Sequence, residues 1–125
     1  MRNLVGNIIF LFHAAFVIPW YALLFVPESV LPNKIAFHFY LTLVVVLHQF
    51  LWGFLIMPWT KKYRMVCILT TFQQLAKGQN ISDPKNYDHS FTQEFLRKIG
   101  INIPHRASTL ITFTILTLVS IQYFF

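Results

Sequence analysis

The feature that most constrains the fold is a stretch without formal charge that runs from Ile35 to Met57. A helix needs about 20 mostly apolar residues to cross a hydrocarbon core about 30 Å thick, and a core helix of a small soluble protein seldom runs so long without a charged face. The sequence therefore predicts a transmembrane helix over residues 35–57. After the closing Pro58 come Lys61, Lys62 and Arg64, which together with Arg106 are predicted to form a basic membrane-surface anchor.

The composition agrees with a membrane protein. Of the 125 residues, 56% are hydrophobic and 11% are charged, against roughly 25% charged residues in an ordinary soluble domain. Fourteen Phe and three Trp provide more apolar surface than the interior of so short a soluble chain could hide, whereas lipid accepts that surface. We expect a single membrane domain over residues 1–125.

Two further apolar segments complete the predicted fold. Residues 4–26 and 107–125 are each long enough to cross the core, and the first two spans should form a helical hairpin around a turn at 27–33. Trp20 and Tyr21 are expected at the far interface as an aromatic belt. The fold class is thus an all-α integral membrane protein with three transmembrane helices and one or two short amphipathic interfacial helices.

The segment over residues 61–104 has a different pattern. Apolar residues recur at helical spacing on one side, and polar residues occupy the other: Met65, Ile68, Leu69, Phe72, Leu75 and Ala76 against Thr70, Thr71, Gln73, Gln74 and Lys77. This predicts an amphipathic helix ended by Gly78, on the cytoplasmic membrane surface or against a partner subunit. A second short helix should begin after Ser90 as N-cap and stop at Gly100.

The net charge of +6 does not indicate nucleic acid, because the basic residues do not form one compact face. Eight of them fall between the second and third apolar segments: Lys61, Lys62, Arg64, Lys77, Lys85, Arg97, Lys98 and Arg106. Such a cluster is typical of a cytoplasmic loop near anionic headgroups. We therefore expect the lipid bilayer as a partner, the N-terminus and residues 61–106 in the cytoplasm, and the C-terminus outside.

Small and polar residues inside the spans indicate helix packing. Those expected to contact other helices rather than lipid are Gly6, His38, Thr42, Gln49, Gly53, Thr109 and Thr112. The polar side of the second span should face the first-span side that carries Gly6 and His13. The hydroxyls of the third span could also line a polar transport path, but no charged side chain joins them, so packing is the favoured interpretation.

Histidine provides the one constellation that could carry chemistry, since no nucleophile elbow, phosphate-binding loop, metalloprotease helix or catalytic carboxylate pair is present. His13 and His48 stand near the middle of the first two spans, so an antiparallel hairpin brings them to similar depth. Two opposed imidazoles can ligate haem b, but two ligands are too few for a closed metal site. The alternative is a packing role. Cys67 is the single cysteine. We expect it to be a small buried apolar side chain rather than an acylated or redox-active thiol.

Several residues resemble a family of small bacterial multi-span membrane proteins known only as a domain of unknown function. They are His13-Ala14-Ala15-Phe16-Val17, His38, Gly53, Pro58-Trp59-Thr60 and Phe91-x-x-Glu94-Phe95-Leu96. The chain departs from the family at Met57, where a Cys is usual, at Trp59 in place of Leu, and at the basic Lys61-Lys62. The resemblance implies a multi-span protein of a bacterial inner membrane and supplies no catalytic residues.

Two functions from different classes follow. The first is a small accessory or structural subunit of a larger membrane protein complex, which packs through its polar helix faces and is not an enzyme. The second is a haem- or metal-binding electron-transfer protein that uses His13 and His48.

Overall fold

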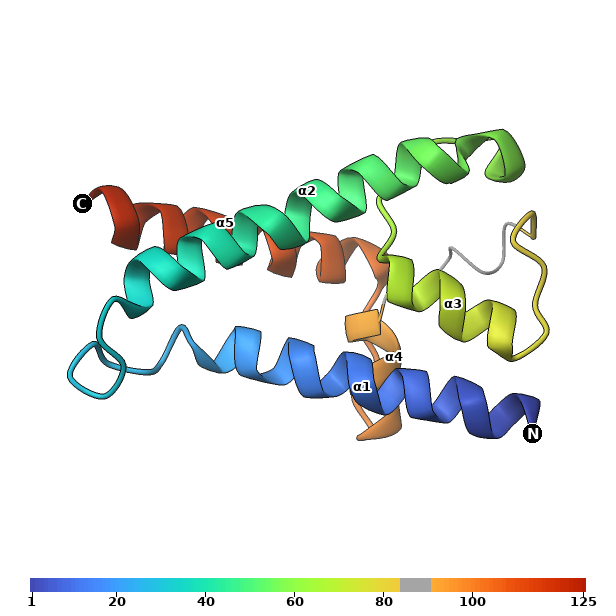
Figure 1. Ribbon diagram of the computed structural model, residues 1–125, viewed down its shortest axis with the longest axis horizontal. Coiled ribbons are helices and arrows are strands. Elements are labelled where there is room, and N and C mark those ends of the chain that lie inside the picture. The colour runs from blue at the N-terminus through green and yellow to red at the C-terminus, as the bar shows by residue number, and fades with distance from the viewer. Residues whose placement is uncertain (84–90) are drawn as a thin grey trace.

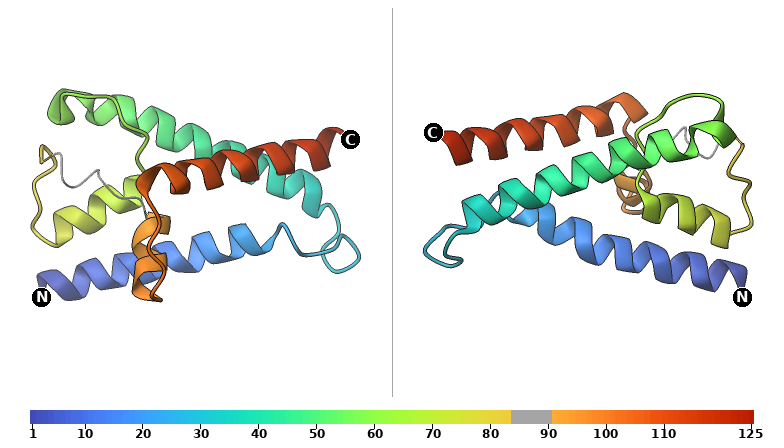
Figure 2. Two further views of the ribbon diagram at one scale, coloured as in Figure 1. Left: turned by 180° about the vertical axis from the view of Figure 1, so that it is seen from behind. Right: turned by 45° about the horizontal axis from the view of Figure 1, so that its top comes forward.

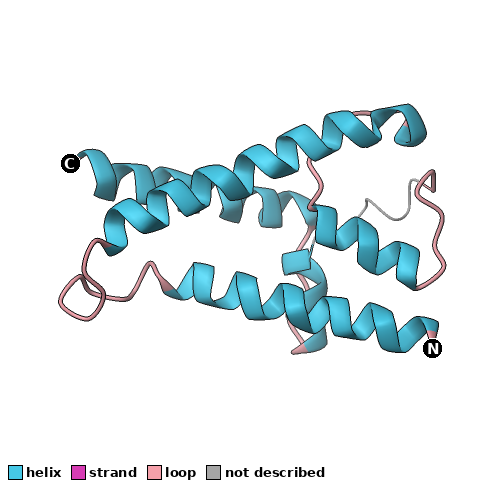
Figure 3. Cartoon of the chain, in the orientation of Figure 1, coloured by secondary structure: helices cyan, strands magenta, loops and turns pink. Residues whose placement is uncertain are grey.

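The computed structural model describes residues 1–83 and 91–125, without the side chain of His105. The described residues form helices and no strands (Figures 1 and 3). The helices are α1 (Arg2–Ala22), α2 (Lys34–Thr60), α3 (Ile68–Ala76), α4 (Phe91–Lys98) and α5 (His105–Phe124). Three of them, α1, α2 and α5 from Arg106 on, are long and apolar enough to cross a membrane. The prediction of an all-helical chain with three helices of spanning length is confirmed.

The boundaries differ from the predicted ones at two prolines. α1 ends at Ala22, four residues before position 26, and the chain turns well before Pro27, which disfavours helical backbone at the residue before it. α2 continues through Pro58 to Thr60, because a proline near the end of a helix removes a single hydrogen bond. The helix then stops at Lys61, whose left-handed backbone (φ 61°) lets its N–H bond to the Met57 carbonyl at 2.9 Å.

The predicted hairpin of α1 and α2 is splayed. Near the connecting loop the two helices meet α5 in an apolar cluster made of Trp20, Phe39, Val45, Ile115 and Val119. Toward the N-terminal end of α1 and the C-terminal end of α2, helix α3 lies between these two helices (Figures 1 and 2). α5 runs beside the first half of α2, where Tyr123 stacks on Phe39 with ring centroids 4.2 Å apart. The splay leaves space at the centre of the bundle.

The amphipathic helix α3 presents its polar side to the protein. Thr71 and Gln73 are each 2% exposed, whereas Phe72 is 47% and Leu75 is 44% exposed. Distant partners make this possible: the Trp52 indole donates to the Thr71 hydroxyl at 3.0 Å. α3 thus packs on its own chain, chiefly on α1, whereas the sequence suggested a membrane surface or another subunit.

Helix α4 packs against α1 and α3. Its first residue, Phe91, is buried against Phe10 and His13 of α1, with ring centroids 5.0 and 3.9 Å away. The helix ends at Lys98, two residues before the predicted stop. Gly100 has left-handed backbone (φ 90°), and the Ile101 N–H bonds to the Leu96 carbonyl at 2.8 Å. The predicted N-cap, Ser90, lies outside the described residues, as does His89.

Candidate functional site: a cavity between the helices

A cavity of about 320 Å³ lies where the splayed helices diverge. All five helices contribute to its walls, together with residues 65–67 that precede α3. Packing closes the bundle on both sides of it: the Trp20 cluster on the loop side, and α3 with α4 on the other. This is the size of a small-molecule site, which typically measures about 300 to 1,000 Å³.

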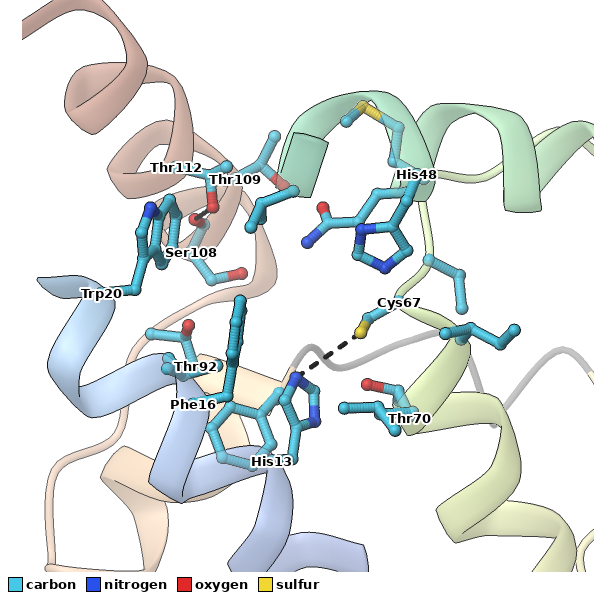
Figure 4. Close-up of a pocket in the computed structure, with 18 of the residues that line it drawn as sticks. His13, Phe16, Trp20, His48, Cys67, Thr70, Thr92, Ser108, Thr109 and Thr112 are labelled. Atoms are coloured by element: carbon cyan, nitrogen blue, oxygen red, sulfur yellow. Dashed lines mark hydrogen bonds between the residues drawn. The ribbon is translucent and has the colours of Figure 1, made fainter. Parts of the chain in front are cut away.

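His13 and His48 both line this cavity. Figure 4 shows His13 on α1 and His48 on α2 with Cys67 between them. His13 is 4% exposed, its ring packs on Phe91, and its Nε2 lies 3.5 Å from the Cys67 sulfur. Its Nδ1 is buried without a hydrogen-bond partner. One imidazole nitrogen of His13 therefore lies beside the Cys67 sulfur, and the other is enclosed by protein.

Cys67 occupies the N-cap position of α3, with extended backbone (φ −74°, ψ 135°), and its side chain reaches the cavity wall. A thiol without a positive charge beside it is a neutral group at physiological pH, and no Lys or Arg is among the described residues that line the cavity. We expected Cys67 to be a small buried apolar side chain. In the structure it is half-buried and lines a cavity that a ligand could enter.

Aromatic rings and neutral hydrogen-bonding groups make up most of the remaining wall. Phe16 and Trp20 of α1 line the cavity together with Ser108, Thr109 and Thr112 of α5, and Figure 4 shows Trp20 beside Ser108 and Thr112. No Lys, Arg, Asp or Glu is among the described residues that line the cavity. An ion would find no countercharge there, so the cavity favours a neutral occupant.

A charged cluster lies just outside the cavity, between α3 and α4. The Gln73 carboxamide donates to both Glu94 oxygens at 3.2 and 3.3 Å, and the Lys77 ammonium lies 3.6 Å from the same carboxylate. These contacts hold α4 against α3. Since Phe91 of α4 supports the His13 ring, the cluster also fixes the position of that imidazole.

The residues predicted to pack do so mostly within the chain. His38 and Thr42 are fully enclosed, Thr42 by accepting a hydrogen bond from the Trp20 indole at 3.0 Å. Gly53 faces the backbone of Arg64. Gly6, however, contacts the side chain of Lys77, which directly follows α3, so the expectation that it faces α2 was wrong. α3 takes that place because the hairpin is open.

The remaining predicted residues lie at the cavity or at the surface. Gln49, Thr109 and Thr112 line the cavity, and the Thr112 hydroxyl donates to the Ser108 carbonyl of its own helix at 3.3 Å. In the predicted anchor, Lys61, Lys62 and Arg106 are exposed, and Arg64 is half-buried. The side chain of His105, a further histidine of the sequence, lies outside the described part of the chain.

Sequence reasoning missed the cavity residues that come from the aromatic belt and from the short helices. Trp20 is buried, and the hydroxyl of Tyr21 lies 2.9 Å from that of Thr92 on α4. Trp20 is therefore covered by protein, whereas the sequence suggested a side chain in contact with the membrane interface; its depth in a membrane stays a prediction. The sequence could have indicated that Trp20 lines the cavity, because Trp20 follows His13 by seven residues and so lies on the same side of α1.

Within the described part of the chain, no three His, Cys, Asp or Glu side chains are placed to hold a metal ion. His13, Cys67 and His48 share the cavity without forming such a group. Comparison of the chain with protein-family models, with curated proteins and with solved structures gives no match. The resemblance to a bacterial membrane-protein family stays a prediction.

Proposed function

We propose that this chain is a multi-span membrane protein that binds a small neutral molecule in the cavity between its spans. The observation that carries the proposal is an uncharged cavity, walled by aromatic side chains, into which His13, His48 and Cys67 bring polar atoms. Sites for small molecules commonly combine apolar walls with a few well-placed polar groups.

The walls narrow the chemistry of the occupant. Flat aromatic surfaces favour a planar ring, and a buried imidazole N–H can donate to a carbonyl oxygen. The lack of a charged side chain disfavours phosphates, carboxylates and amines. A quinone-type molecule, which is neutral, flat and soluble in lipid, meets all three requirements.

The experiment is a binding titration with decylubiquinone, on protein reconstituted in nanodiscs. Thr112→Phe fills the cavity without removing a hydrogen bond to another helix, because the Thr112 hydroxyl bonds only within α5. Thr117→Phe is the matched control, since Thr117 is exposed on the same helix and bonds to its own Phe113 carbonyl at 2.9 Å.

We expect Thr112→Phe to weaken binding at least about tenfold, equivalent to about 1.4 kcal/mol, and Thr117→Phe to leave it unchanged. Equal affinities in the two variants would mean that the quinone partitions into lipid and does not enter the cavity. An alkylbenzene and an alkylbenzoate of similar size extend the test, because the proposal requires both to bind more weakly than the quinone.

Haem b is the second candidate, because His13 and His48 line the same cavity. Ligation would require the His13 Nε2 to leave its contact with the Cys67 sulfur. The protein purified after expression with haem supply should then show a Soret band, which His13→Ala and His48→Ala should each remove. A colourless preparation that binds quinone would decide for the first candidate.

The role as an accessory subunit of a larger membrane complex stays a prediction, compatible with either ligand. If this role is correct, the chain should copurify with other subunits at a fixed stoichiometry. A monodisperse chain of 14.7 kDa in native-detergent mass measurement would contradict it.

We further propose a cytoplasmic N-terminus and an external C-terminus, supported by the exposed Lys61, Lys62 and Arg106. Labelling of cysteines placed at Ser29 and Ser82, in a Cys67→Ala background, tests this orientation.

A further inference from the structure

The chain turns back along α2 directly after that helix ends. The Tyr63 hydroxyl donates to the Phe50 carbonyl at 3.3 Å. The Arg64 backbone passes so close to Gly53 that an added Cβ would lie 3.0 Å from the Arg64 carbonyl carbon. By Cys67 the chain has reached the cavity and His48, which is near the middle of α2. Residues 61–67 therefore retrace the second half of this spanning-length helix.

Helix α3 then runs antiparallel to the first half of α1. At its start Cys67 contacts His13, and just after its end the Lys77 side chain lies against Gly6. Figure 2 shows α3 beside α1 from two further directions. Because α1 is long and apolar enough to span a membrane, any depth that residues 6–13 occupy in the bilayer is the depth of α3 as well.

The polarity of α3 fits surroundings of lipid rather than water. Its buried side carries Thr70, Thr71, Gln73 and Gln74, while Phe72 and Leu75 point outward. The side of α1 that faces away from α3 is also apolar in this half of the helix, with Leu4 and Ile8 exposed. A helix with this inverted arrangement would expose apolar area to water at a cost of about 25 cal/mol per Å², which acyl chains do not impose.

We infer that residues 61–76 form a re-entrant segment, so that α3 lies within the cytoplasmic half of the bilayer with Phe72 and Leu75 against acyl chains. Non-helical backbone is tolerated at such depth where protein covers it, and in this segment Val66 is buried while residues 63–65 and 67 are half-buried. Lys61 and Lys62 are exposed at the turn, where long basic side chains can reach the headgroups. This inference is independent of what the cavity binds.

Site-directed spin labelling in phosphatidylcholine–phosphatidylglycerol vesicles tests the placement. Nitroxides are attached at Phe72→Cys and at Leu75→Cys in a Cys67→Ala background, and collision with apolar oxygen is compared with collision with a polar nickel chelate. Both residues are already exposed, so the labels should be accommodated. Leu47→Cys, on an exposed position of α2, serves as the lipid reference, and Ser82→Cys, in the exposed loop, serves as the water reference.

We expect positions 72 and 75 to match position 47, with high oxygen and low nickel accessibility. Nickel accessibility near that of position 82 at both positions would place α3 in water and overturn the inference. Low accessibility to both reagents would mean that another protein covers this side, which would overturn it equally. Because two separate positions are labelled, one misfolded variant does not decide the result.

Discussion

The Trp20 indole of α1 donates a hydrogen bond to the Thr42 hydroxyl of α2 over 3.0 Å, with both residues buried. This bond joins α1 and α2 on the loop side of the cavity. From this bond toward the N-terminus of α1, the two helices separate and α3 lies between them (Figure 1). The bond therefore defines where the closed part of the bundle ends and the cavity begins.

Replacing Thr42 by Val should destabilise the protein. The change keeps the side-chain shape but leaves the buried indole N–H without an acceptor, at a cost of about 1 to 3 kcal/mol. Thr114→Val is the control, since its exposed hydroxyl bonds only to Leu110 of its own helix, and it should change stability by less than about 0.5 kcal/mol. Unfolding in mixed micelles, followed by circular dichroism, measures both, and equal stabilities would show that the bond contributes nothing.

The two buried glycines of the spans should respond differently to Ala. In Gly53→Ala the new Cβ would meet the Arg64 backbone, which cannot move without shifting residues 61–67, so we expect a loss of about 1 to 3 kcal/mol. In Gly6→Ala it would meet the flexible Lys77 side chain, which can move aside. The helix propensity gained, up to about 1 kcal/mol, then offsets the contact. The same unfolding assay would refute this close packing if Gly53→Ala were the more stable variant.

Glu94→Ala should loosen α4. The Gln73 carboxamide and the Lys77 ammonium would both lose their partner, and Gln73 is almost fully buried. We expect faster hydrogen exchange of the α4 backbone amides, measured by mass spectrometry on the peptide that contains them. Arg97→Ala, an exposed change on the same helix, should leave exchange near that of the parent protein. Unchanged exchange in Glu94→Ala would mean that the other contacts of α4, which include the packing of Phe91 on α1 and the bond between the Tyr21 and Thr92 hydroxyls, are enough to hold the helix.

His13→Phe should separate ligand binding from packing. Phenylalanine can keep the ring contact with Phe91 but removes both imidazole nitrogens, including the Nε2 that lies beside Cys67. If a ligand carbonyl accepts a hydrogen bond from this imidazole, decylubiquinone affinity should fall about two- to tenfold, the equivalent of one hydrogen bond, while thermal stability changes little. An unchanged affinity would assign the polar contact to His48 or Cys67.

Sequence patterns predicted the long helices well and the contacts of the short one poorly. Uncharged runs of spanning length locate α1, α2 and α5, and the antiparallel hairpin explains why His13 and His48 reach one cavity. The position of α3 depends on long-range bonds that periodicity does not contain: Thr71 is bonded to a residue 19 positions earlier, and Gln73 to one 21 positions later. Without those partners, a polar helix side is naturally assigned to water.

The splay of the hairpin could not be predicted for a related reason. Gly6 and His13 share one side of α1, and that side suits either α2 or a third element equally well. In the structure α3 packs on this side of α1. Gly6 faces Lys77, and His13 lines the cavity. Only the packing of the complete chain distinguishes the two arrangements.

The most direct test of a ligand in the cavity uses Cys67, the single cysteine of the chain and part of the cavity wall. The alkylation rate of Cys67 by a membrane-permeant maleimide is measured in nanodiscs with and without decylubiquinone, whose fully substituted ring resists thiol addition. At ten times the dissociation constant, bound quinone should slow alkylation about tenfold, and Thr112→Phe should abolish this protection. An alkylation rate that does not depend on quinone concentration, in protein whose fold is intact, would contradict the account.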